Sequence, residues 1–345
     1  MEALKQTVRE AWRPCYLIDE LTGKFPRVRF YLDSKGVYDS LRSGKCTAEP
    51  ELQKELDYVI QGMRRMGVDM LRDVVWTPRE LNRADWLTKP IWCFQWDQMA
   101  DALVAEGFCV VTYDLWGRGH SSAPRDLDSD YGGEGHVGQL HALMEHLQLT
   151  EKPKHIIGHS MGGAIAALYV EQHGSLATIL SLSLLSPAGL MTAKDVKMLR
   201  SCGCLHGFAR RMLKGSQEKA WTDDFFEKKG PAFESTMEMM RLQAEHNEGS
   251  FEAFFLSVLQ FPLFGMDKTV EAVSKMSDLR VLLLWGSNDV SVPIEPNFSR
   301  WRQILEKGSC NLQHKLFEKT GHGFYLEAAE KVIAEIAPFV KGEPA

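Results

Sequence analysis

The chain has 345 residues and a mass of 39.0 kDa, and 44% of its residues are hydrophobic and 25% charged. These fractions are close to globular averages, so they exclude wholesale disorder and a fibrous architecture; the length allows one large domain or two small ones. With 40 basic and 46 acidic residues the formal net charge is −6, which argues against a nucleic-acid partner.

Membrane and secretory signals are absent from the sequence pattern. The longest apolar stretch, residues 178–190, is too short to span a bilayer, and the N-terminal residues carry acids and no hydrophobic core of a signal peptide. The seven cysteines show no spacing typical of a metal site or a disulfide framework, and Cys202 and Cys204 are read as ordinary thiols. We therefore expect a cytoplasmic protein without metal or organic cofactor; its oligomeric state stays open.

The first part of the chain has weak signals. Residues 1–70 are expected to form an N-terminal extension, with a short strand at 27–32 and a helix at 49–66, and residues 74–76 predict a second short strand.

From about residue 105 onward, short apolar runs alternate with amphipathic segments. Strands are expected at 108–113, 154–157, 178–185, 280–285 and 312–317. Helices are expected at 137–149, at 162–173, from about 293, and at 325–340. This alternation predicts the α/β class: a mostly parallel central sheet with helices on both faces.

One block interrupts the alternation. Residues 191–275 contain no good strand and are dense in Met, Phe, Lys and Glu. Since the block falls between two strands, it predicts an inserted helical cap, with residues 71–190 and 276–345 forming the core. Phenylalanines in the cap could line an acyl pocket or only pack it on the core, and these two readings stay open: Phe251, Phe254, Phe255, Phe261 and Phe264.

The sharpest motif is Gly158-His159-Ser160-Met161-Gly162, a G-x-S-x-G pattern between a short apolar strand and an Ala-rich helix. In that context the serine sits on a tight strand-to-helix turn, with small residues around it because a Cβ would collide with the neighbouring strand and helix. The motif predicts that Ser160 is an exposed nucleophile, whereas His159 is expected to point away from it.

A nucleophilic serine needs a base, and the base needs an orienting acid. His322 follows the last expected strand in a Gly-flanked loop, and Asp289 follows the strand at 280–285, so both lie at the carboxyl ends of strands. Asp195, after the preceding strand, is a weaker rival for the acid. His120 and His136 are expected near a pocket rather than in the catalytic set.

The order Ser160, Asp289, His322 is that of the α/β-hydrolase triad, and the chain resembles this superfamily over residues 92–341. The likeness lies in the ester- and lipid-hydrolysing branch, near monoacylglycerol-lipase-like and serine-aminopeptidase-type sequences. Residues 114–121 (DLWGRGHS) resemble the family's D-x-x-G-x-G-x-S loop, and residues 186–189 resemble the segment after its sixth strand. The resemblance implies an α/β-hydrolase fold and makes the Met161 N–H one oxyanion donor.

The sequence departs from the family at the second oxyanion donor. A His-Gly-type loop normally supplies it, but no glycine occurs between Gly67 and Gly107, and Pro78 and Pro90 have no N–H to donate. An N–H between Pro90 and Cys93 could substitute, so the second donor is unknown.

The expected function is a serine hydrolase that cleaves carboxylic esters, with a small-molecule ester or lipid such as a monoacylglycerol as substrate. An aminopeptidase or a carbon–carbon bond hydrolase would use the same triad. A peptidase acting on free N-termini would also need carboxylates for the ammonium group, and acids of the cap could supply them: Asp223, Asp224, Glu234 and Glu238. A non-catalytic binding protein is a further alternative because of the atypical oxyanion loop.

Overall fold

The computed structural model describes residues 30–32, 57, 60–61, 74–76, 93–119, 121–123, 130–174, 178–192, 206–247 and 249–343. The chain divides into two compact units, Met1–Pro90 and Ile91–Ala345. In the first unit β1 (Phe30–Leu32) and β2 (Val74–Trp76) pair in parallel, which agrees with the two short strands predicted there. Most of the helix expected at 49–66 lies outside the described residues.

The second unit is built on a four-stranded sheet whose order follows the chain. Its strands are β3 (Lys154–His159), β4 (Ile179–Leu185), β5 (Arg280–Gly286) and β6 (Asn311–Phe317). All three pairings are parallel, with Ser183 opposite both Ile157 and Leu282. β5 is buried from Val281 onward and almost wholly apolar, as a strand covered on both faces requires. The predicted parallel α/β sheet is confirmed.

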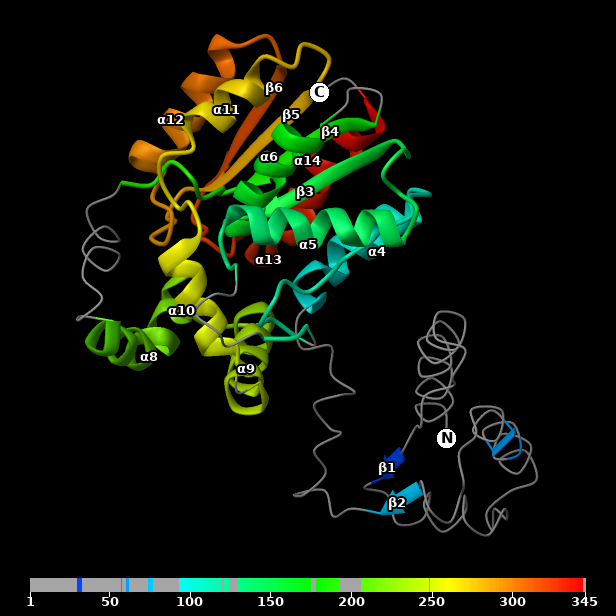
Figure 1. The fold of residues 1–345 in the computed structure, drawn as a ribbon, viewed down its shortest axis with the longest axis vertical. Coiled ribbons are helices and arrows are strands. Elements are labelled where there is room, and N and C mark those ends of the chain that lie inside the picture. Colours follow the sequence, from blue (N-terminus) through cyan, green and yellow to red (C-terminus); the bar gives the residue numbers. More distant parts are fainter. Residues whose placement is uncertain are drawn as a thin grey trace. The chain divides into compact units, whose positions relative to one another are not determined.

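Helices cover both faces of this sheet (Figure 1). One apolar core lies under α5 (Gly133–His146), α6 (Met161–His173), α11 (Asp267–Ser274) and α12 (Ile294–Lys307). The other lies under α4 (Asp97–Ala105), α13 (Phe324–Glu327) and α14 (Ala329–Lys341), and the 3-10 turn η3 (Cys93–Trp96) leads into α4. Because both of its faces are packed, the sheet holds the residues at its strand ends in fixed positions.

Three further helices interrupt the alternation between β4 and α11. They are α8 (His206–Asp223), α9 (Pro231–His246) and α10 (Ser250–Gln260), and Figure 1 shows them grouped beyond one end of the sheet. We call these three helices, together with the described residues that connect and directly follow them, the cap. They contain no strand among their described residues, in keeping with the predicted helical insertion, whose boundaries stay a prediction.

Two predicted elements need correction. Residues 108–113 form no strand in the structure: no ladder of backbone hydrogen bonds joins them to the described strands, and Val111 is 41% exposed. Their apolar run predicts a buried strand, but the segment is only partly buried: Phe108 and Val110 lie against the second core and Tyr113 against the first. The single helix expected at 325–340 is broken at Ala328, where α13 ends and α14 begins, because the backbone at Ala328 is not helical.

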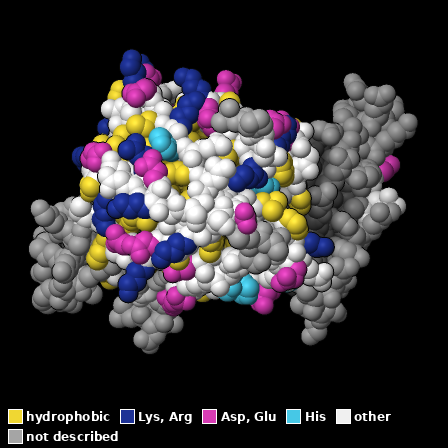
Figure 2. Space-filling model, turned by 90° about the horizontal axis from the view of Figure 1, so that it is seen from above, with side chains coloured by type: hydrophobic (Ala, Val, Ile, Leu, Met, Phe, Trp, Pro, Cys, Tyr) yellow, Lys and Arg dark blue, Asp and Glu magenta, His cyan; other side chains and the backbone are white. Residues whose placement is uncertain are grey.

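The surface is mixed in charge. On the face seen in Figure 2, basic and acidic side chains of the described residues lie interspersed. Ion pairs such as Arg300–Asp267 at 2.6 Å belong to this surface. Within the described ranges, every helix is too short or too polar to cross a lipid bilayer.

Candidate active site

Ser160 occupies the turn between β3 and α6. Its backbone has φ 54° and ψ −122°, a combination that an L-residue adopts only under constraint from its surroundings. The Ser160 N–H donates to the Leu185 carbonyl at 2.9 Å, and the Ser160 carbonyl accepts from Ala188 N–H at 3.0 Å. Neighbouring β4 and the segment after it therefore hold the strained turn from both sides.

Small residues around Ser160 permit this turn. A Cβ on Gly158 would lie 2.3 Å from the Gly162 carbonyl oxygen, and one on Gly163 would lie 2.9 Å from Pro187 Cβ. A side chain at either position would push strand and helix apart. The predicted collision therefore holds for Gly158 of the motif, whereas a Cβ on Gly162 would meet nothing within 4 Å; the second tight contact lies one residue later, at Gly163.

His322 and Asp289 form a buried hydrogen-bonded pair. His322 Nδ1 lies 2.7 Å from Asp289 Oδ2, and the side chains are 7% and 0% exposed. Asp289 Oδ1 accepts from the Val292 N–H at 2.7 Å, which fixes the carboxylate. Burial lowers the pKa of His322, but the charges of Asp289 and, to a lesser degree, Asp224 outweigh it, so the pKa lies above the ordinary histidine value.

The loops that carry this pair are tied to each other and to the cap. The Asn288 N–H donates to the Thr320 carbonyl at 2.8 Å, and the Gly323 N–H donates to the Asp224 carbonyl at 2.7 Å. The Glu327 carboxylate accepts from Gly321 N–H at 2.6 Å and from Phe226 N–H at 2.8 Å. The position of His322 thus depends on the end of α8 as well as on the sheet.

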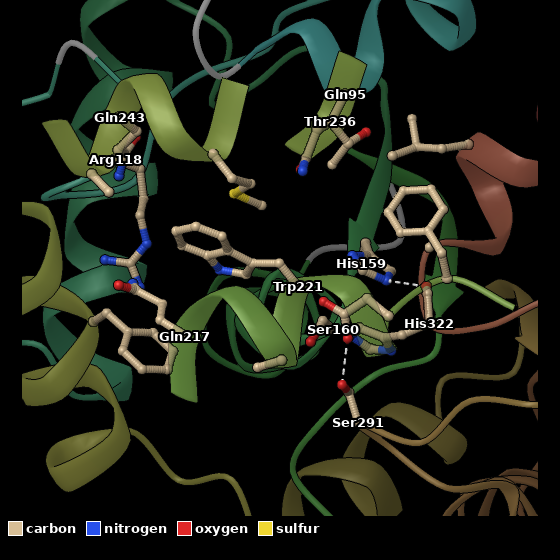
Figure 3. Close-up of a pocket in the computed structure, with 18 of the residues that line it drawn as sticks. Gln95, Arg118, His159, Ser160, Gln217, Trp221, Thr236, Gln243, Ser291 and His322 are labelled. Atoms are coloured by element: carbon tan, nitrogen blue, oxygen red, sulfur yellow. Dashed lines mark hydrogen bonds between the residues drawn. The ribbon is translucent and has the colours of Figure 1, made fainter. Parts of the chain in front are cut away.

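A cavity of about 390 Å³ opens between the strand ends and the cap. Ser160 and His322 both line it, and Figure 3 shows them together at one end. Between their described side chains no hydrogen bond is formed, which is common for catalytic pairs without substrate. The structure therefore brings Ser160 and the His322–Asp289 pair to one site.

His159 lines the same cavity as Ser160. The sequence predicts only that its side chain points away from Ser160; in the structure its ring lies 4.4 Å from the His322 ring between centroids. Its Nε2–H donates to the His322 carbonyl at 2.9 Å. Burial, and then the charge of His322, hold the pKa of His159 well below its ordinary value, so the imidazole of His159 is neutral. Its hydrogen bond to the His322 carbonyl holds the His322 backbone in place.

The phenylalanines of the cap mostly pack rather than line the cavity. Of the five considered, Phe254 lines it, whereas Phe255 and Phe261 are 4% and 0% exposed in the interior. Trp221 and Phe225 of the cap supply further aromatic lining that the sequence pattern did not single out.

The four acids of the cap that could bind an ammonium group lie in different environments in the structure. Glu234 and Glu238 are exposed, and Asp223 pairs with Lys219 and with Lys228. Asp224 instead lines the cavity and accepts a hydrogen bond from Ser291 Oγ. Burial raises the pKa of Asp224, although the nearby His322 charge opposes this.

Of the two expected oxyanion donors, only Met161 lies among the described residues. Met161 begins α6, and its N–H donates no hydrogen bond to the described part of the chain, as the first residue of a helix allows. The usual position of the second donor, residues 77–86, lies outside the described residues, and of the residues from Pro90 to Cys93 only Cys93, the first residue of η3, is described. Just beyond it, Gln95 lines the cavity, and Tyr325 O–H donates to Gln95 Oε1 at 3.1 Å.

Three remaining predictions concern peripheral residues. Asp195, the rival acid, and His120 lie outside the described residues. His136 is fully buried among Trp116, Tyr131 and Phe261 and does not line the cavity. Among the described residues, no His, Cys, Asp or Glu side chains cluster in a group of three that could hold a metal ion.

The amino-acid sequence of the chain matches a known family. The sequence profile of the Alpha/beta hydrolase family matches residues 84–335, which is well over half of the chain. The chain belongs to the alpha/beta hydrolase family. The matched residues 84–335 of this alpha/beta hydrolase include the G-x-S-x-G motif, the four strands of the parallel sheet and the loops after β5 and β6.

Relatives and solved structures agree with that placement. The bovine (Bos taurus) monoacylglycerol lipase ABHD6 is 25% identical over 245 residues, which cover 64% of this chain and 65% of that lipase, slightly under two thirds of its length. Lipase 3 of Moraxella sp. (strain TA144) is 25% identical over 246 residues and covers 71% and 72% of the two chains. A thermophilic esterase from Thermogutta terrifontis has the same fold, with a TM-score of 0.57 and 20% identity over 72% of this chain and 85% of that one.

Besides Trp221 and Phe225, sequence patterns missed two polar residues that the structure brings to the cavity. Gln95 follows the region where the motif fails, so no pattern marked it. Arg118 lies in the DLWGRGHS loop, whose resemblance to the family gave it no part in the site, and its side chain reaches the cavity (Figure 3).

Proposed function

We propose that this alpha/beta hydrolase is a serine hydrolase that cleaves carboxylic esters of hydrophobic acyl groups, such as monoacylglycerols. The observation that carries the proposal is the strained Ser160 on the wall of the same cavity as His322, which is paired with Asp289. The names of the relatives, a monoacylglycerol lipase and a bacterial lipase, support the ester class.

In the proposed reaction Ser160 Oγ attacks the ester carbonyl while His322 takes the serine proton. Asp289 holds Nδ1–H of the imidazole, so that Nε2 is the atom that accepts the proton, and it stabilises the imidazolium that forms. The Met161 N–H stabilises the oxyanion. His322 then gives its proton to the leaving alcohol, and a water activated by the same histidine releases the acid from the acyl-enzyme.

The second oxyanion donor is proposed to be the side-chain amide of Gln95. Tyr325 is held neutral because burial raises the pKa of its hydroxyl, so the hydroxyl can donate to Gln95 Oε1. With Oε1 engaged, the two N–H groups of Nε2 remain available as donors, and Gln95 lines the same cavity as Ser160. A side-chain amide can serve this role where a backbone N–H is missing.

The test compares p-nitrophenyl esters of increasing acyl length with aminoacyl-naphthylamides, using the wild-type protein and Ser160→Ala. Each buried methylene contributes about 0.8 kcal/mol, so kcat/KM should rise with chain length until the cavity is filled. Ser160→Ala should abolish this activity. Faster cleavage of the amides would instead favour an aminopeptidase, for which Asp224 would be the ammonium ligand, and a rate that is flat with ester length would overturn the hydrophobic-ester proposal.

A further inference from the structure

Arg118 stands at the opposite end of the cavity from Ser160 and His322. In the view of Figure 3 its guanidinium points into the cavity beside Gln217, with Trp221 between it and the catalytic end. Within the described part of the chain its side chain makes one hydrogen bond, from Nη1 to the Trp116 carbonyl at 3.3 Å, and no ion pair. Among the described residues, most of its five N–H donors therefore have no acceptor, and the guanidinium that carries them lines the cavity.

The loop that carries Arg118 is rigidly held. The side chain of Gln243 in α9 bridges it, because its Oε1 accepts from Gly119 N–H at 3.1 Å and its Nε2 donates to the Gly117 carbonyl at 3.4 Å. From the core, Gln139 Nε2 donates to the Asp114 carbonyl at 3.1 Å. A Cβ on Gly117 would lie 1.9 Å from Ala253 Cβ, so the loop is pressed against α10. Contacts from both the cap and the core therefore hold the backbone at Arg118 in place.

Among the described residues that line the cavity, Arg118 and Asp224 lie at opposite ends. Asp224, the carboxylate among its described lining residues, is at the His322 end and is engaged by Ser291. Burial lowers the pKa of Arg118 to about 10, which leaves the guanidinium charged at neutral pH. A charged group that is enclosed without a counter-ion is costly, and a ligand anion removes that cost.

We propose that Arg118 binds an anionic group of the substrate, a carboxylate or a phosphate, at the end remote from the scissile ester. The proposal rests on the proposed ester hydrolysis and narrows its substrates to esters that carry an anionic group away from the scissile bond, on either the acyl or the alcohol side. Gln217, which lines the cavity beside Arg118, is the neighbouring polar side chain that could share the anion.

The test measures one ratio: kcat/KM for the mono-p-nitrophenyl ester of a dicarboxylic acid, divided by kcat/KM for the p-nitrophenyl ester of the monocarboxylic acid of equal length. Across a series of lengths, the ratio should peak where the terminal carboxylate reaches Arg118. Arg118→Met should lower the peak ratio by about tenfold or more, the loss typical of one charge-assisted hydrogen bond, and Arg118→Lys should lower it less. The matched control is Arg241→Met, which removes an exposed arginine of the cap that pairs with Glu218; it should keep the ratio.

A ratio that is unchanged by Arg118→Met at every length would overturn the proposal. If Arg118→Met does not fold, as judged by circular dichroism, inhibition of the wild-type enzyme decides. Dicarboxylates should then inhibit more strongly than monocarboxylates of equal length, with the preference reduced in Arg118→Lys; weaker inhibition at every length would overturn the proposal.

A second pair of substrates shows whether the acyl side or the alcohol side of the ester carries the anion. A carboxylate on the acyl side is probed by the dicarboxylic series, and a phosphate on the alcohol side by 1-octanoylglycerol 3-phosphate against 1-octanoylglycerol. Preference for the anionic member of either pair, lost in Arg118→Met, supports the proposal and identifies the side; no preference in both pairs overturns it. Neutral esters cleaved through Ser160 without any anion preference would leave the proposed function standing. Conversely, Arg118-dependent binding of octanedioate by calorimetry without any hydrolysis would support the anion site and overturn the proposed function.

Discussion

At the scale of single residues, the pairing of His322 with Asp289 has a consequence for the pH dependence. The proposed base acts only when neutral, and Asp289 holds the pKa of His322 above its ordinary value of 6.5. In the wild-type enzyme kcat/KM should therefore fall on the acid side with an apparent pKa above that value. Asp289→Asn removes the charge that favours the imidazolium, so the acid limb should move to lower pH while the plateau falls by about 10⁴.

A pH–rate profile of kcat/KM for both proteins measures this. The fall of the plateau and the shift of the limb are separate readouts, since a merely structural loss would lower the plateau without moving the limb. An acid limb that stays in place in Asp289→Asn would mean that another group, such as Asp224, governs the His322 pKa.

Gln95 carries a second residue-scale prediction. If its amide is the second oxyanion donor, Gln95→Leu should lower kcat by about 10²–10³ with little change in KM, because the lost interaction forms in the transition state. Tyr325→Phe is the matched comparison: it removes the hydroxyl that orients the amide and keeps the ring, so it should cost less. Equal and small effects of both changes would place the second donor elsewhere.

At the scale of elements, Glu327 joins α13, the His322 loop and the cap. Its carboxylate accepts from Gly321, Phe226 and Glu227 N–H groups at 2.6, 2.8 and 3.0 Å. Glu327→Ala leaves these donors without their acceptor, and we expect a loss of about 1–3 kcal/mol in the free energy of unfolding together with a lower kcat. Urea denaturation and steady-state kinetics measure the two effects.

A control distinguishes this role from general helix weakening. Glu330→Ala changes a solvent-exposed acid in the first turn of α14 and should leave kcat near the wild-type value. If Glu330→Ala and Glu327→Ala had the same effect on kcat, the bracing role of Glu327 would be contradicted.

The elements of the second unit could be predicted where local pattern and burial agree. β5 is a continuous apolar run because both of its faces are covered, and α12 is amphipathic because one face rests on the core. Residues 108–113 show the same apolar pattern as β5, yet they form no ladder with the described strands, because pairing depends on partners that a local pattern does not reveal. The break at Ala328 likewise has no Gly or Pro to mark it.

At the scale of the whole molecule, buried His136 links global stability to pH. Burial, and then the Arg118 charge, lower the pKa of His136 to about 4 in the folded state, whereas an unfolded histidine has a value near 6.5. As pH falls below 6.5 the unfolded state takes up the proton first, so stability is lost between about pH 6.5 and 4, by up to about 3 kcal/mol.

Thermal or urea unfolding across this pH range tests the prediction. His136→Leu keeps an apolar side chain of similar size and removes the titrating group, so its stability should depend less steeply on pH than that of the wild-type protein. His146→Leu changes an exposed histidine of the same helix and serves as the matched control. An equal pH slope in His136→Leu and the wild-type protein would contradict the assignment.

As with the fold, the site residues that could be predicted are those whose position follows from the local sequence pattern. Ser160, Asp289 and His322 could be chosen because each follows an expected strand, and a parallel sheet gathers such residues at one edge. Arg118, Gln95 and Trp221 reach the cavity from a loop, a 3-10 turn and a cap helix, so their meeting depends on how the cap docks, which no local pattern encodes. The same dependence explains why Phe255 and Phe261 pack in the interior instead.

The most direct measurement of the central claim is covalent labelling of the intact protein with a fluorophosphonate, followed by mass spectrometry of its peptides. An activated serine at the elbow predicts stoichiometric labelling on Ser160, loss of the label in Ser160→Ala, and strong slowing in His322→Ala, because the neutral imidazole activates the hydroxyl. Absence of labelling in wild-type protein that is folded by circular dichroism, or a label on another serine that persists in Ser160→Ala, would contradict the assignment of Ser160 as the nucleophile.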